Sequence, residues 1–175
     1  RSRAKAVNFG IVYGISDFSL SQDLKITRKE AAEYMEIYFD RYPKIKGYLE
    51  SVKEEAKEKG YVLTVLNRRR FIPEIKSSNK IVKALGERLA MNAPIQGSAA
   101  DIIKLAMVKV YNRIKKENLE SQMILQVHDE LILNVKENEL EIVKALVKEE
   151  MENVLKMSVT LEVDTNIGNT WYDAK

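Results

Sequence analysis

The chain has 175 residues, of which 45% are hydrophobic and 31% are charged, and its net charge is +3. This length suits one domain or pieces of two, and the composition is ordinary for a globular protein. No apolar run approaches the ~20 residues that span a bilayer, and no signal peptide is recognisable. The absence of cysteine excludes disulfides and thiolate metal sites. We therefore expect no membrane partner and a location in the reducing cytoplasm.

The opening stretch carries four residues at a strict four-residue spacing, namely Arg1, Lys5, Phe9 and Tyr13. On a helix, which we expect over residues 3–14, these side chains share one face. Cations bind phosphate oxygens and aromatic rings stack on a base or sugar, so this face matches the parts of a nucleoside triphosphate. An amphipathic helix with solvated cations and core aromatics explains the same spacing.

Helices follow in chain order. Residues 19–22 and 27–30 both fit the capping-box pattern, and the second opens a predicted helix over residues 28–40. Pro43 suits the first turn of another helix, and Gly60 suits its end.

A β-like run over residues 61–66 comes next. It leads into Asn67 and then into Arg68, Arg69 and Arg70. This order predicts a hairpin with a basic tip.

The helical pattern then resumes over residues 79–92, and Pro94 interrupts it. Ser98 and Asp101 fit a third capping pattern. We therefore predict that a new helix begins there and ends near residue 117.

Charge is distributed unevenly along the chain. Residues 61–90 carry a net +5, residues 91–116 carry +4, and residues 117–175 carry −8. A basic middle can follow a phosphate backbone, although charge runs are usually solvated faces.

Two apolar strands within residues 122–136 meet at His128 and Asp129. Tight hairpin turns usually carry Asn-Gly or Asp-Gly, because their central residues often need a positive φ. His and Asp tolerate that conformation better than most residues. The imidazole and the adjacent carboxylates of Asp129 and Glu130 therefore indicate a displayed site, although an ordinary surface turn explains them too. A helix over residues 138–156 follows, and then a strand over residues 158–165.

Three ordered motifs make the whole chain resemble the C-terminal part of a family A DNA polymerase, the bacterial DNA polymerase I type. The opening four-residue series with Gly14 resembles that family's fingers-helix motif, and residues 126–130 resemble its palm carboxylate motif. Between them, Arg88, Asn92 and Gln96 match the segment that contacts primer–template. The resemblance implies template-directed nucleotidyl transfer to a primer 3′-hydroxyl.

The resemblance also implies roles for the opening series. Arg1 and Lys5 would bind the triphosphate, and Lys5 would stabilise charge on the leaving pyrophosphate. Phe9 would lie against the sugar and base, where phenylalanine goes with poor acceptance of dideoxynucleotides. Tyr13 would stack near the templating base and leave that position when the fingers close. The partners implied are deoxynucleoside triphosphates and primer–template DNA.

The remaining implied roles belong to the hairpin tip. Asp129 would be a catalytic ligand of a centre with two Mg²⁺ ions, and Glu130 would be an accessory catalytic carboxylate. His128 would contact the primer terminus. The predicted primer–template contacts on the basic hairpin are Arg68, Arg69 and Arg70.

The fold class that we expect is α+β. A helical fingers portion over residues 1–85 would accompany part of an antiparallel palm sheet flanked by helices over residues 86–175. The boundary between the two portions falls within residues 75–96.

One motif of the family is absent from the sequence, namely the second catalytic aspartate in a run of the form Asp-Tyr-Ser-x-x-Glu. The chain also begins with arginine, inside a predicted helix that has no N-cap residue. We therefore expect a fragment that lacks the N-terminal part of the polymerase and is inactive alone. Unpaired palm strands would favour self-association of the fragment.

Two other functions fit parts of the sequence. A metal-dependent phosphohydrolase could use His128 and Asp129, but that chemistry generally requires several histidines and this chain has one. A non-catalytic nucleic-acid-binding module would need only the basic middle, which makes it the main alternative for the isolated fragment.

Overall fold

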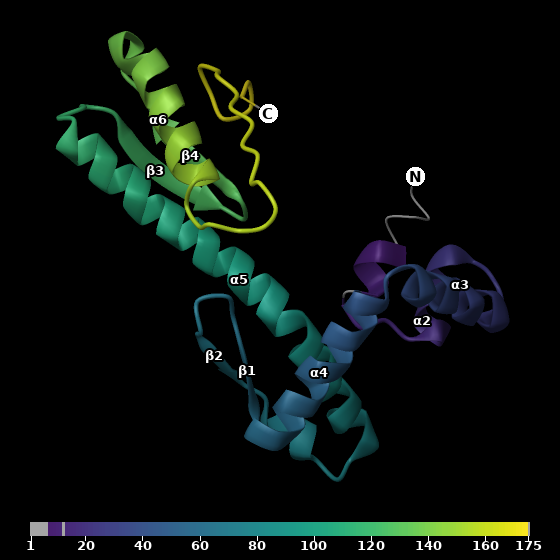
Figure 1. Cartoon of the computed structure of the whole chain (residues 1–175). Coiled ribbons are helices and arrows are strands. Elements are labelled where there is room, and N and C mark those ends of the chain that lie inside the picture. The colour runs from purple at the N-terminus through teal and green to yellow at the C-terminus, as the bar shows by residue number, and fades with distance from the viewer. Residues whose placement is uncertain (1–6, 12, 175) are drawn as a thin grey trace. The chain divides into compact units, whose positions relative to one another are not determined.

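The computed structural model describes residues 7–11 and 13–174 (Figure 1). The chain divides into two compact units, Arg1–Ser98 and Ala99–Lys175. Helices dominate, and two small antiparallel sheets of two strands each accompany them. The expected α+β class is therefore confirmed, while the division into fingers and palm portions stays a prediction.

The first described segment is helical over residues 7–11 and ends at Gly14. Gly14 has a φ of +71°, and its N–H donates to the Ile11 carbonyl at 3.0 Å. The N–H of Ile15 donates to the Gly10 carbonyl at 2.8 Å, which completes a Schellman motif. Glycine is suited to this position because it has no Cβ to resist a positive φ.

Helix α2 spans Asp17–Leu24 and is capped by Ser16, whose hydroxyl accepts a hydrogen bond from the Ser19 N–H at 3.1 Å. The expected capping box over residues 19–22 is therefore wrong. Ser16 takes the cap because it stands before the acidic Asp17, and a carboxylate is favourable in the first turn.

Helix α3 spans Arg28–Arg41 and opens with the predicted capping box. The Thr27 hydroxyl accepts from the Glu30 N–H at 3.2 Å, and the Glu30 carboxylate accepts from the Thr27 N–H at 2.8 Å. Helix α4 spans Pro43–Lys59, with proline in its first turn as expected. Gly60 ends α4 with a φ of +79°.

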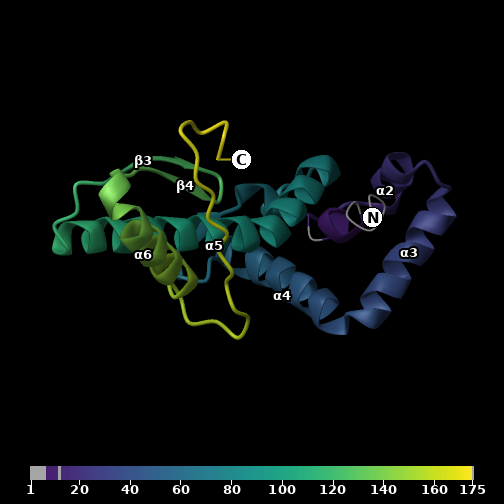
Figure 2. The same ribbon diagram turned by 90° about the horizontal axis from the view of Figure 1, so that it is seen from above.

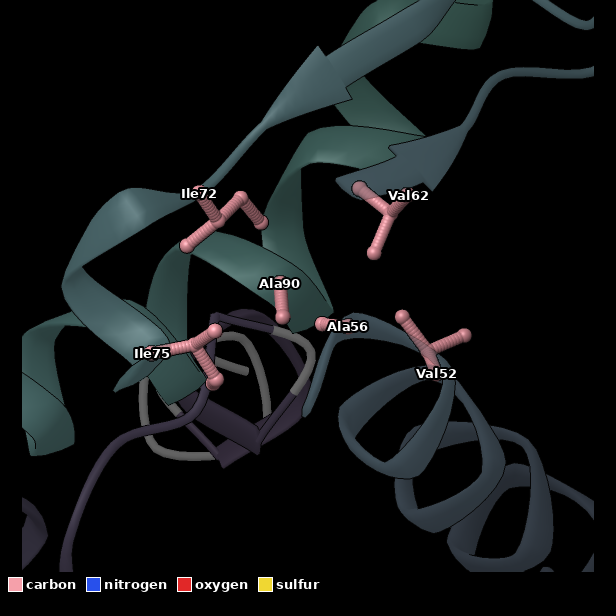
Figure 3. Packing of buried hydrophobic residues seen from close by; sticks show 6 residues of the cluster. All are labelled: Val52, Ala56, Val62, Ile72, Ile75 and Ala90. Carbon is pink, nitrogen blue, oxygen red and sulfur yellow. The ribbon is translucent and has the colours of Figure 1, made fainter. Parts of the chain in front are cut away.

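The hairpin β1–β2 is confirmed. Strand β1 (Tyr61–Leu63) pairs with β2 (Arg69–Phe71), and Asn67 in the turn has a φ of +60°. A 3₁₀ helix, η1 (Pro73–Lys76), follows β2. The buried side chains of this region come from α4, the hairpin, η1 and the next helix, and form one cluster (Figure 3): Val52, Ala56, Val62, Ile72, Ile75 and Ala90.

Helix α5 is continuous over Lys80–Lys116 and contains Pro94. The prediction that Pro94 interrupts the helix is therefore wrong, as is the prediction that Ser98 and Asp101 open a new one. Proline in a helix interior costs roughly 3 kcal/mol because it removes a backbone hydrogen bond and crowds the preceding turn. Burial of Ala90 and Pro94 in unit 1 offsets that cost. The helix ends at Lys116, close to the predicted end, and Asn118 follows it with a φ of +54°.

In unit 2, β3 (Gln122–Val127) pairs with β4 (Glu130–Asn134) in the predicted hairpin. A register shift between Met123 and Leu125 marks a bulge. The hairpin and α6 lie beside the C-terminal half of α5 in both views (Figures 1 and 2). The core that they share is a cluster of five buried residues, Val110, Ile114, Val143, Leu146 and Val147.

Helix α6 spans Leu140–Glu152, after the 3₁₀ helix η2 (Glu137–Glu139), so it is shorter than predicted. The predicted strand over residues 158–165 is wrong, because that segment forms no strand. None of the described strands pairs with residues 158–165 through backbone hydrogen bonds. The Val163 N–H donates instead to the Glu152 carboxylate at 3.1 Å.

Glu139 joins the loop after α5 to the start of α6. Its carboxylate accepts from the N–H groups of Glu120 and Ser121, both at 2.9 Å, and from the Ser121 hydroxyl at 2.5 Å. The Ser121 hydroxyl in turn accepts from the Lys136 N–H at 3.1 Å. The hydroxyl of Ser121 first, and then the N–H of Glu120, lower the pKa of Glu139 below its usual value.

Candidate active site

The opening four-residue series is described in part. Arg1 and Lys5 lie outside the described residues. The rings of Phe9 and Tyr13 are stacked, with centroids 6.1 Å apart and planes 25° apart. Phe9 is 51% exposed and Tyr13 is 40% exposed, so these aromatics do not form a buried core.

Gly14 packs against α5 within unit 1. A Cβ built on Gly14 would lie 2.3 Å from Met91 Cε and 3.4 Å from Arg88 Cγ. Both of those residues lie on α5, so the end of the first helix sits directly against α5. This close approach places the aromatic pair beside Arg88.

A surface cleft of about 420 Å³ results from this packing. Phe9, Tyr13 and Arg88 all line it. The sequence predicted these residues separately, as nucleotide and primer–template contacts, and unit 1 brings them together. Asp23 of α2 also lines the cleft. Sequence reasoning missed Asp23, because its spacing within α2 carries no signal of what lies opposite.

Arg88, Asn92 and Gln96 form a stripe on α5 at four-residue spacing. Arg88 and Gln96 are exposed, and Asn92 is half-buried. The Oδ1 atom of Asn92 is buried and makes no hydrogen bond among the described residues. A buried polar atom without a hydrogen bond lowers the stability of the folded protein unless a partner binds it. The stripe therefore contains one acceptor that a ligand can satisfy.

The basic hairpin presents its three arginines differently. Arg68 donates from Nη2 to the Gly97 carbonyl at 3.0 Å. Arg69 lies over the ring of Tyr61, with its Cζ 5.0 Å from the ring centroid. Arg70 is exposed in β2. The predicted basic tip is therefore reduced to Arg68, since Arg69 and Arg70 belong to the strand.

The predicted tip of the second hairpin is formed by His128 and Asp129, between the paired residues Val127 and Glu130. His128 has a φ of +53° and Asp129 does not have a positive φ, so the turn is not of type I′. The Gln126 side chain holds the turn by donating from Nε2 to the His128 carbonyl at 2.6 Å. His128, Asp129 and Glu130 are all exposed, which leaves the imidazole and both carboxylates open to a ligand.

Asp129 and Glu130 offer oxygen donors only, which suits Mg²⁺. Over residues 7–11 and 13–174, no group of three or more acidic or histidine side chains is placed to hold a metal ion. Mg²⁺ is usually held by one or two carboxylates together with waters and substrate phosphates, so the pair fits a partial site of this kind.

Within the same described residues, no helix combines the length and apolarity needed to cross a membrane.

Comparison with known proteins decides the family. The family model of DNA polymerase family A matches residues 1–173. The chain belongs to DNA polymerase family A. The predicted resemblance is therefore confirmed.

Relatives within this family are close over the whole chain. DNA polymerase I of Caldicellulosiruptor bescii is 56% identical over 175 residues, which is 100% of this chain and 21% of the relative. DNA polymerase I of Bacillus subtilis is 53% identical over 100% of this chain and 20% of the relative. The family A chain thus spans about a fifth of the length of the curated relatives that it matches.

A solved structure has the same fold. It is the POL domain of Pol1 from M. smegmatis, in complex with DNA primer–template and dNTP. The TM-score is 0.96 at 48% identity, over 99% of this chain and 30% of that one.

Proposed function

We propose that this chain supplies the nucleotide-binding surface and one carboxylate motif of a DNA-directed DNA polymerase. The observation that carries the proposal is the cleft of unit 1. There the stacked rings of Phe9 and Tyr13 meet Arg88, which lies more than seventy residues further along the sequence. Aromatic faces stack on bases and a guanidinium binds phosphate or base edges, so the cleft has the chemistry needed for a nucleotide and its template. Relatives that are DNA polymerase I support the same assignment.

The nucleotide would be bound by the opening series. Arg1 and Lys5 would bind the triphosphate, and Lys5 would stabilise the charge that develops on the leaving pyrophosphate. Phe9 would lie against the sugar and base, and Tyr13 near the templating base. The exposure of both rings supports these positions, because a stacking ligand needs an open face.

The carboxylates of the second hairpin would act at the primer end. Asp129 would hold Mg²⁺, with Glu130 as the accessory carboxylate and His128 at the primer terminus. When bound, such ions lower the pKa of the 3′-hydroxyl and stabilise the leaving oxygens. Asp129 would contribute a carboxylate oxygen from a turn that is exposed to solvent. We place this reaction in the cytoplasm.

Primer extension by the intact polymerase tests the proposal. Asp129→Asn removes a charged ligand and is expected to lower the extension rate by at least about a hundredfold, since even outer-shell changes at metal sites cost 10–100-fold. Asp164→Asn is the matched control, because Asp164 is also an exposed aspartate but belongs to no motif. Extension by Asp129→Asn within about twofold of the unsubstituted enzyme would contradict the proposal.

For the 175-residue chain by itself we propose no catalysis, because its sequence contains no Asp-Tyr-Ser-x-x-Glu motif. Sustained primer extension by the purified chain with Mg²⁺ and all four nucleotides would contradict this. Duplex binding is the second candidate function of the isolated chain, and the exposed cations of unit 1 favour it. These are Arg70, Lys76, Lys80 and Lys83. Binding that weakens steeply with salt would support it.

We also propose that the isolated chain self-associates through β3. Ile124 is 59% exposed and Leu125 is 45% exposed, so two adjacent apolar side chains face solvent. Sedimentation of a monomer at high protein concentration would contradict this.

A further inference from the structure

We infer that the turn of the first hairpin braces α5 and thereby positions Gln96, with Ser98 and Arg68 as the bracing residues. The hairpin turn, residues 64–68, touches α5 at Gly97 and Ser98. The inference rests on the proposed function, in which Gln96 contacts primer–template. It assigns Arg68 to positioning within the protein, in place of the DNA contact expected from the sequence.

Ser98 makes the first part of the brace. Its hydroxyl donates to the Pro94 carbonyl at 2.5 Å, one turn earlier in α5. The same oxygen accepts a hydrogen bond from the Val65 N–H at 2.8 Å, in the hairpin turn. A serine hydroxyl has one proton and two lone pairs, so one group can serve both partners. Ser98 therefore joins the hairpin to the turn of α5 that begins at Pro94.

Arg68 makes the second part. The side-chain Nη2 of Arg68 donates to the Gly97 carbonyl at 3.0 Å, and the backbone N–H of Arg68 donates to the Thr64 hydroxyl at 3.1 Å. A hydrogen bond from a charged donor is about twice as strong as a neutral one. Gly97 lacks a side chain where the hairpin approaches, since a Cβ there would lie 2.6 Å from Thr64 Cγ2. The approach therefore depends on both a glycine and a guanidinium.

Gln96 lies inside the braced turn, between Pro94 and Ser98. Pro94 cannot donate a backbone hydrogen bond to the preceding turn, so α5 is less restrained here than elsewhere. A serine that bonds back to the carbonyl four residues earlier also tends to bend a helix. The two contacts from the hairpin restore a fixed backbone at this point. The exposed side chain of Gln96 then leaves α5 in one defined direction.

Arg68 as a phosphate ligand is the alternative, and salt dependence separates the two roles. For a duplex-binding protein, a plot of log affinity against log salt concentration has a negative slope. The slope becomes shallower by about 0.9 for each phosphate contact that is removed. A bracing arginine makes no such contact, so its removal weakens binding without changing the slope. Arg70 is exposed in β2 two residues away and provides the matched comparison.

The test measures primer–template affinity of the intact polymerase by fluorescence anisotropy at several salt concentrations. Ser98→Ala and Arg68→Met are each expected to weaken binding about fivefold, the effect of one typical hydrogen bond, with the salt slope unchanged. Arg70→Met is expected to reduce the slope by about 0.9. Ser98→Thr keeps the hydroxyl and is expected to restore affinity. Ser51→Ala is the matched control, because among the described residues the Ser51 hydroxyl bonds only the Tyr48 carbonyl of its own helix.

A double-mutant cycle with Gln96→Ala then tests positioning. Without the Gln96 side chain, Ser98→Ala should weaken binding less than twofold, because nothing remains to be positioned. A full fivefold loss in that background would overturn the inference, as would an Arg68→Met slope that falls like that of Arg70→Met. If Ser98→Ala does not fold, the same cycle is measured with Arg68→Met in place of Ser98→Ala, and the same limits on the loss of affinity decide the inference. Failure of the unsubstituted protein to bind primer–template would overturn the proposed function and this inference together.

Discussion

Gly86 offers a sharp test of the packing around α5, because two physical effects on its substitution oppose each other. Gly86 lies inside α5, where alanine is the better helix former by about 1 kcal/mol. A Cβ at this position would lie 2.6 Å from the Ile75 nitrogen and 2.8 Å from the carbonyl carbon of Glu74. These are backbone atoms of η1 and cannot rotate away.

The magnitude follows from comparing the two effects. Overpacking a closed core typically costs 1–3 kcal/mol, and the upper end applies because the neighbouring atoms are backbone. Subtracting about 1 kcal/mol for helix propensity leaves a net loss of about 2 kcal/mol for Gly86→Ala. With a urea m value of about 2 kcal/mol/M, the midpoint of unfolding should fall by about 1 M.

Gly47→Ala is the matched control. Gly47 also lies inside a helix, α4, but a Cβ there meets no atom of the described residues within 4 Å. Only helix propensity then acts, so the urea midpoint should rise by about 0.5 M. Circular dichroism follows both titrations, and hydrogen exchange of η1 should quicken in Gly86→Ala alone. An unchanged or raised midpoint for Gly86→Ala would refute the packing that places η1 against α5.

Three further predictions concern single positions. Gly14→Ala should lower the free energy of unfolding by about 1–2 kcal/mol in a urea titration, because its φ is +71°; no loss would contradict the Schellman motif. His128→Gly should raise the melting temperature by about 2–4 °C in calorimetry, because glycine relieves the positive φ of the turn; a fall would contradict this. Glu139→Gln should lower the melting temperature at pH 7. Since folding lowers the pKa of Glu139, its contribution is present above the ordinary value of 4.5 and is lost as the pH falls through the folded-state pKa. The difference from the unsubstituted protein should therefore shrink in acid, and a difference independent of pH would contradict the role of the carboxylate.

Features with local causes could be predicted from the sequence. The capping box of Thr27 and Glu30 involves residues that are three apart in the sequence. Gly60 ends α4 because glycine adopts the positive φ that ends a helix, which depends on that residue alone. The turn at His128 and Asp129 is also local, since the two apolar strands on either side of it pair directly with each other. The backbone around such residues needs little help from distant parts of the chain.

Features with distant causes could not be predicted. Local chemistry favours a helix break at Pro94 and a new start at Ser98, but α5 continues through both residues. There the Ser98 hydroxyl bonds the Pro94 carbonyl and accepts from the hairpin turn. The strand expected after α6 failed for the same kind of reason, because a strand needs a partner that sequence pattern does not supply. At Pro94 and Ser98, tertiary contacts outweighed local preference.

The candidate site divides in the same way. Spacing identified Phe9 and Tyr13, and motif order identified Asp129, but no spacing predicted that Arg88 would line the same cleft as the aromatics. Arg68 was placed on the basic hairpin correctly, while its hydrogen bond to Gly97 depends on how the hairpin packs.

The continuity of α5 has a practical consequence for anyone who divides this chain for expression. The boundary between the two compact units falls between Ser98 and Ala99, yet the peptide bond that joins these residues lies inside α5. A break there would leave four carbonyls on one piece and four N–H groups on the other without helical partners. It would also place Ser98, which accepts a hydrogen bond from the hairpin turn, at a chain end. A break in the loop at residues 77–79 would leave α5 whole, but it would detach α5 from α4, β1 and η1, whose buried side chains share a core with Ala90. The chain is therefore best expressed undivided.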